Sequence, residues 1–73
     1  MNYITFDKDR YHLQNDMSAW CVKHFGEGQW ITGPYPEEWE GLPNWTIHCM
    51  FGRTTFAFKK QRDYAWFILE WAS

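Results

Sequence analysis

The sequence is poor in cysteine and in long apolar runs, and both shortages limit what the protein can be. It contains two cysteines, Cys21 and Cys49, in 73 residues, whereas secreted domains of this size usually hold several disulfide bridges. Its first residues lack the basic and apolar segments of a signal peptide. No apolar run approaches the roughly 18 residues typical of a membrane-spanning helix. We therefore expect a cytosolic protein with reduced, structural thiols and no membrane segment.

Motifs for catalysis and metal binding are also scarce. The closest approach to a zinc ligand set is Cys21-x-x-His24 together with His48-Cys49. Neighbouring residues on a strand point to opposite faces of the sheet, so His48 and Cys49 would not converge on one ion. The sequence has no nucleophile elbow and no glycine loop in a strand-to-helix setting. We predict a protein that is not an enzyme, with no catalytic residue, no cofactor and no metal site.

Charge is limited in amount and uneven in distribution. The net charge of −2 disfavours nucleic acid as the main partner, because phosphate binding needs an excess of Lys and Arg. Residues 26–44 carry acidic but no basic side chains, and residues 53–62 carry the reverse. The acidic residues are Glu27, Glu37, Glu38 and Glu40, and the basic ones are Arg53, Lys59, Lys60 and Arg62. These segments are either ordinary solvated surface or charged regions that steer a partner.

Aromatic residues, in contrast, are abundant: the chain has six Trp, six Phe and four Tyr. Each buried ring removes roughly 150–250 Å² of surface from water, so these residues can stabilise a small domain without disulfides. Their number also exceeds what a two-layer domain of this length can bury. Some aromatic side chains should therefore lie on the surface, where a partner can reach them.

Residues 45–58 show the alternation of a β-hairpin. Gly52-Arg53 separates two strands and suits a two-residue type II′ turn, which takes Gly at its first central position. In that turn Phe51 pairs with Thr54, and the two residues share a face. The aromatic face of the predicted hairpin then consists of Trp45, Ile47, Cys49, Phe51, Phe56 and Phe58. Thr46, His48, Met50, Thr55 and Ala57 lie on the opposite face.

One helix is predicted before this hairpin and one after it. Residues 16–25 repeat apolar side chains at helical spacing, and residues 61–72 contain good helix formers and no Gly or Pro. The second helix has one apolar stripe, with Trp66 and Leu69 outside it. That stripe consists of Tyr64, Phe67, Ile68 and Trp71. It can cover the aromatic face of the hairpin.

The fold class that follows is α+β. Residues 2–6 and 10–14 have the pattern of an N-terminal hairpin or a bent pair of strands. We predict a small antiparallel sheet that contains the 45–58 hairpin. Two helices, at about 16–25 and 61–72, are predicted to pack on one face of this sheet.

Residues 1–73 are predicted to form a single domain that contains one long loop, residues 26–44. The loop is rich in Gly and Pro but carries three aromatic residues, Trp30, Tyr35 and Trp39. Loops of this length are either disordered or functional, and disordered segments are poor in aromatic residues. Two roles stay open for Trp39: it contacts a partner, or it covers Trp66 within the monomer.

The C-terminal stretch FAFKKQRDYAWFILEW resembles the end of small uncharacterised proteins encoded by large contractile-tailed bacteriophages. The residues that carry the resemblance are Phe56, Phe58, Lys59, Asp63, Phe67, Leu69 and Trp71, together with the earlier pair Trp20-Cys21. The resemblance implies a phage origin and a location in the host cytoplasm or in the virion. It implies no catalytic residues.

These observations together predict a binding protein without catalysis. We expect a small phage accessory protein that binds a host or phage protein, for example as an inhibitor of a host enzyme or defence factor. The residues predicted to bind the partner are Tyr35, Glu37, Glu38, Trp39, Arg53 and Trp66. The alternatives are a structural component of the virion or a self-assembling component, a single-stranded nucleic-acid binder, and a small metal-dependent enzyme. A homo-oligomer is a further possible partner state.

Overall fold

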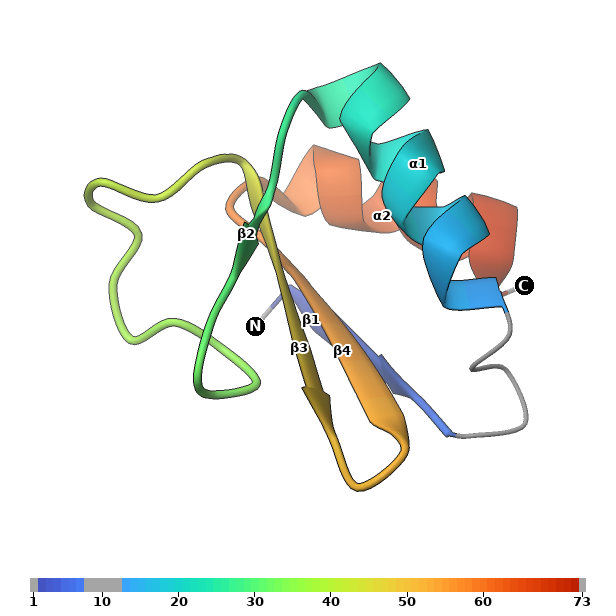
Figure 1. The fold of residues 1–73 in the computed structure, drawn as a ribbon. Coiled ribbons are helices and arrows are strands. Elements are labelled where there is room, and N and C mark those ends of the chain that lie inside the picture. The colour runs from blue at the N-terminus through green and yellow to red at the C-terminus, as the bar shows by residue number, and fades with distance from the viewer. Residues whose placement is uncertain (1, 8–12, 73) are drawn as a thin grey trace.

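The computed structural model describes residues 2–7 and 13–72 of the chain (Figure 1). These residues form two helices and a four-stranded sheet. The elements in chain order are β1 (Tyr3–Phe6), α1 (Gln14–Phe25), β2 (Gln29–Trp30), β3 (Trp45–Met50), β4 (Arg53–Phe58) and α2 (Gln61–Trp71). The predicted α+β fold is confirmed.

The strands lie in the order β1-β4-β3-β2. β4 pairs antiparallel with both β1 and β3, whereas β2 pairs parallel with β3 over two residues. The sheet is therefore mixed rather than wholly antiparallel. In Figure 1 the two helices lie together on one side of the sheet, and the loop that follows β2 lies on the other.

The turn of the β3–β4 hairpin differs from the expected one. Met50 pairs with Arg53, so the central turn residues are Phe51 and Gly52. Both have positive φ, 54° and 76°, which is the pattern of a type I′ turn. The predicted type II′ turn, with Phe51 opposite Thr54, is wrong. Thr54 pairs two residues earlier on β3, and because side chains alternate with a period of two, the faces of both strands stay as predicted.

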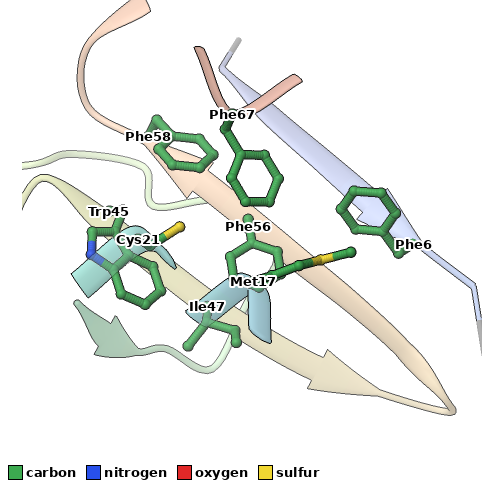
Figure 2. Packing of buried hydrophobic residues seen from close by; sticks show 8 residues of the cluster. All are labelled: Phe6, Met17, Cys21, Trp45, Ile47, Phe56, Phe58 and Phe67. Atoms are coloured by element: carbon green, nitrogen blue, oxygen red, sulfur yellow. The ribbon is translucent and has the colours of Figure 1, made fainter. Parts of the chain in front are cut away.

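The side of the sheet that faces the helices holds the hydrophobic core (Figure 2). Phe56 and Phe58 of β4 are fully buried there. The ring of Phe67, from α2, lies 5.0 Å from each of them between centroids. The core is completed by Phe6, Met17, Cys21, Trp45 and Ile47. The predicted packing of the second helix on the aromatic face of the hairpin is confirmed.

Both helices begin and end close to the predicted residues. In α2 only Phe67 of the predicted apolar stripe is fully buried, and the other members of the stripe are partly buried. Trp66 and Leu69 lie outside that stripe and are exposed, as predicted. α2 also places Asp63 in its first turn, where the helix dipole favours an acidic side chain.

The N-terminal prediction is only partly testable. The expected strand over residues 2–6 corresponds to β1, which pairs with β4. Residues 10–12 of the expected second strand lie outside the described residues. Gln14, the last residue of that expected strand, is instead the first residue of α1, so the strand does not extend to residue 14.

β2 is held in place by the first residue of β3. The indole nitrogen of Trp45 donates a hydrogen bond of 2.7 Å to the carbonyl oxygen of Gly26. A side chain at Gly28 would collide with the same indole ring, so this position requires Gly. Beyond β2, the amide of Ile31 donates to the carbonyl of Ile47 at 3.0 Å. These contacts fix where the long loop leaves the sheet.

Candidate partner-binding face

The sheet surface opposite the helices, here called the open face, carries small and polar side chains. The register aligns Thr5, Thr55 and His48 in one row across β1, β4 and β3. Thr46 and Ala57 form the next row with Tyr3. All four of these side chains on β3 and β4 are nevertheless buried, namely Thr46, His48, Thr55 and Ala57. Because no helix packs on this face, another segment of the chain must cover these side chains.

The cover is the loop of residues 31–44, which follows β2. The ring of Tyr35 lies 5.4 Å from that of Tyr3 on β1. Trp39 packs on Tyr35 at 5.9 Å, and its indole nitrogen donates a 3.4 Å hydrogen bond to the Tyr35 hydroxyl. At the end of the loop, the side chain of Asn44 donates to the carbonyl of Phe25 at 3.3 Å. The loop is therefore part of the folded structure rather than a free segment.

Between this loop and the hairpin tip lies a cavity of about 470 Å³, here called the loop–hairpin cavity. Strand residues Thr5, His48 and Thr55 line it from the sheet. Pro34 lines it from the loop, and the hairpin end contributes Met50, Phe51 and Arg53. The volume lies within the roughly 300–1,000 Å³ typical of ligand sites.

The polar side chains of the cavity are oriented by hydrogen bonds. The Thr5 and Thr55 hydroxyls are 2.8 Å apart and bond to each other. Nδ1 of His48 lies 3.1 Å from the carbonyl oxygen of Ile31. A carbonyl oxygen can only accept, so Nδ1 carries the proton, and in the neutral ring Nε2 is an acceptor. His48 is only 8% exposed, which further restricts its ring.

The hairpin end supplies exposed apolar surface at the edge of the cavity. Phe51 is 94% exposed, and its neighbour Met50 is also exposed. Arg53 forms an ion pair of 3.3 Å with Asp7, and both side chains are largely in solvent. An ion pair this exposed is weak and engages only Nε of Arg53, so the guanidinium remains a cation at the edge of the cavity.

The structure separates the predicted partner-binding residues into two groups. Tyr35, Glu37, Glu38 and Trp39 belong to the loop over the open face, and Arg53 lines the loop–hairpin cavity that the same loop borders. Glu37 and Glu38 are exposed. Trp66 instead belongs to the helical layer.

In that layer, Trp66 packs against α1. Its ring lies 5.4 Å from Trp20, 4.6 Å from His24 and 5.7 Å from Phe25. Trp39 has its ring contact with Tyr35, so the two tryptophans belong to different aromatic clusters. The alternative in which Trp39 covers Trp66 is not what the structure shows.

Apart from Arg53, the sequence does not single out the residues that line the cavity, above all Phe51 and His48. The predicted type II′ turn puts Phe51 on the aromatic face, because it takes Gly52 as the first central turn residue, whereas Gly52 is the second. A signal was present, since Gly at the second central position also suits a type I′ turn. The cavity depends on Pro34 and the loop, which no local sequence pattern brings to the sheet.

The structure does not bring together the residues considered for nucleophilic or metal chemistry. Cys21 and Cys49 are free thiols, and burial raises the pKa of the Cys21 thiol, which disfavours the reactive thiolate. The Cys49 thiol lies 3.3 Å from Oε1 of Gln14 on the helix side, whereas His48 lies on the open face. No group of three or more metal-ligating side chains occurs within residues 2–7 and 13–72.

Comparison with known proteins finds no match among protein-family models, curated proteins or solved structures. Within the part of the chain that the structure describes, no helix is both long and apolar enough to cross a membrane. The functional interpretation therefore rests on the geometry of the loop and the hairpin.

Proposed function

We propose that this protein is a non-catalytic binding protein whose loop–hairpin face engages another protein. The loop–hairpin face comprises the 31–44 loop, the exposed hairpin end and the cavity between them. The observation that carries the proposal is Phe51, an almost fully exposed aromatic residue in a left-handed backbone conformation.

Phe51 does not serve the stability of the monomer. A side-chain-bearing residue in the left-handed region costs roughly 1–2 kcal/mol, and type I′ turns favour Asn or Asp at this position. With 94% of its surface exposed, Phe51 recovers almost none of that free energy by burial. An aromatic residue kept at such a position fits a role in recognition, because aromatic side chains dominate the binding energy of protein interfaces.

The resemblance of the C-terminal stretch to phage proteins supports a specific setting for this binding. In that setting the chain is a small phage accessory protein in the host cytoplasm, and its partner is a host or phage protein. Inhibition of a host enzyme or defence factor is the most specific form of the proposal. Because the cavity is next to Phe51, one partner segment can contact both.

The proposal is tested by replacing Phe51 with the residue that the turn prefers. Phe51→Asn should raise the free energy of unfolding by about 1 kcal/mol, because Asn tolerates positive φ. The same change should reduce capture of a partner from a lysate of phage-infected bacteria by at least tenfold. Denaturant titration and quantitative mass spectrometry of captured proteins measure the two effects, and purified partner then confirms direct binding.

Leu69→Gln is the matched control for this experiment. Leu69 is 72% exposed on α2, in the helical layer on the other side of the sheet, and Gln is a good helix former. Its replacement removes a similar exposed apolar side chain without touching the loop–hairpin face. Undiminished capture by Phe51→Asn, or equal loss with Leu69→Gln, would contradict the proposal.

A further inference from the structure

We propose that the loop–hairpin cavity receives a tyrosine side chain of the partner protein, whose hydroxyl binds between His48 and the threonine pair. The inference rests on the proposed function only in taking the ligand from a protein. It is carried by the donors and acceptors of the cavity and by its apolar walls.

The hydrogen-bond acceptor of the cavity is Nε2 of His48. Because Nδ1 of His48 donates to the carbonyl of Ile31, Nε2 is the ring nitrogen that remains for a ligand. Within the described residues no hydrogen bond engages Nε2. His48 lines the cavity, so a ligand that enters can donate a hydrogen bond to this atom.

The hydrogen-bond donor of the cavity is a hydroxyl of the Thr5–Thr55 pair. In the 2.8 Å contact between the Thr5 and Thr55 hydroxyls, one hydroxyl donates and the other accepts. The accepting hydroxyl keeps its own proton for a further bond. Thr55 is directly opposite His48 in the β3–β4 register. In the arrangement in which Thr5 donates to Thr55, the free donor is the Thr55 hydroxyl, and it lies beside the acceptor. A phenol hydroxyl, which both donates and accepts, matches this pair.

Apolar side chains of the cavity would surround the ring of the ligand. Pro34, Met50 and Phe51 supply a pyrrolidine ring, a thioether and an aromatic ring around the cavity. Thioether and aromatic groups contact rings favourably. A carboxylate or phosphate anion has no proton to donate to Nε2, so it would leave this acceptor without a bond. A phenylalanine ring would leave both polar partners without a bond.

The test uses three amides that differ only at the para position: N-acetyl-tyrosinamide, its O-methyl ether and N-acetyl-phenylalaninamide. Titration of the isotope-labelled protein by NMR follows the signals of His48 and Thr55. We expect saturable shifts with the tyrosine amide and at least tenfold weaker binding of the other two. Equal binding of the three amides, or unchanged His48 and Thr55 signals up to the solubility limit, would overturn the inference.

The variant His48→Asn tests the role of Nε2 in the same titration. In His48→Asn the side-chain amide can still donate to Ile31, because Asn nitrogen replaces Nδ1, but no atom occupies the place of Nε2. This variant should lose the preference for tyrosine over its O-methyl ether. A preference that persists in folded His48→Asn would contradict the role of Nε2. If the variant does not fold, the three-amide series on the unaltered protein still decides.

The failure of this inference and that of the proposed function can be told apart. If the amides do not bind while Phe51→Asn abolishes capture of the partner, the cavity is not a tyrosine site and the binding function stands. If the tyrosine amide binds selectively while Phe51→Asn captures the partner fully, the tyrosine site stands and the role of Phe51 in the proposed function falls.

Discussion

The two faces of the β4 strand show how differently one strand can be used. Phe56 and Phe58 point to the helices and are fully buried among other rings. Alternating with them along the strand, Thr55 and Ala57 point to the open face and are also buried. One face thus supplies most of the apolar burial that drives folding. The other contains polar groups and a cavity, where changes alter binding with less effect on the fold.

The same contrast separates the aromatic clusters. Rings on the helix side form a continuous core from Phe6 to Phe58 through Phe67. On the open face, Tyr3, Tyr35 and Trp39 form a short row in which each contact joins the loop to itself or to an edge strand. Loss of a core ring should therefore affect the whole domain, whereas loss of a loop ring should remain local.

The largest expected effect is on the helix side. Phe56→Ala and Phe67→Ala should each lower the free energy of unfolding by about 3–5 kcal/mol, because both rings are fully buried and leave a cavity. The whole stability of a domain of this size is often only about 5 kcal/mol, so either variant should be largely unfolded. Thermal melting followed by circular dichroism measures the loss.

If both variants melt within a few degrees of the unaltered protein, the assignment of folding energy to the helix side is wrong. Tyr35→Ala, a ring of the open face, is the matched comparison. It should melt well above both core variants, because Tyr35 is only partly buried in the loop.

The sequence predicts the features of the two faces that depend on local patterns, and it does not predict those that depend on contacts between distant residues. The alternation in residues 45–58 predicts both faces of the hairpin, and the face assignment survives the wrong turn because the register differs by an even number of residues. The apolar stripe of α2 predicts which side packs on the sheet. Both patterns are local and periodic, so they can be recognised in a single sequence.

The open face could not be predicted in the same way. β2 has two residues and therefore no periodicity, and its parallel pairing depends on Trp45 reaching back to Gly26. The packing of Tyr35 on Tyr3 joins residues far apart in the chain through a loop without regular structure. The aromatic content of the loop argues against disorder, but only the fold brings the loop beside the hairpin tip to form a cavity.

An intermediate effect is expected from the two tryptophans that the sequence singled out. Trp66→Ala should lower the free energy of unfolding by about 2 kcal/mol, because its half-exposed ring packs on three aromatic or imidazole rings of α1. Trp39→Ala should lower it by less than about 1 kcal/mol, since its ring contact is with Tyr35 alone among the described residues. Denaturant titration of both variants measures the difference.

Partner capture by the same two variants completes this comparison. On the proposed function, Trp39→Ala weakens capture more than its small loss of stability explains. Trp66→Ala should reduce capture only in proportion to its unfolded fraction. The reverse order, with Trp66 needed for binding and Trp39 dispensable, would move the interface to the helical layer.

Small effects of opposite sign are expected from two threonines on the open face. Thr46 is fully buried, and its Oγ1 has no hydrogen-bond partner among the described residues. Thr55 is almost as buried, but its hydroxyl bonds to that of Thr5. A buried polar group without a partner destabilises a protein, whereas a satisfied one contributes modestly to stability. The same substitution should therefore have opposite signs at these two positions.

Thr46→Val should raise the free energy of unfolding by about 1 kcal/mol, because it replaces an unsatisfied hydroxyl with a methyl group of similar size. Thr55→Val should lower it by about 1 kcal/mol, since it removes a hydrogen bond. For a domain of this length each change corresponds to a shift in Tm of about 4–8 °C. Valine favours strands in both cases, so strand propensity alone predicts equal signs. Two shifts in the same direction would mean that propensity, and not hydrogen bonding, decides the stability of the open face.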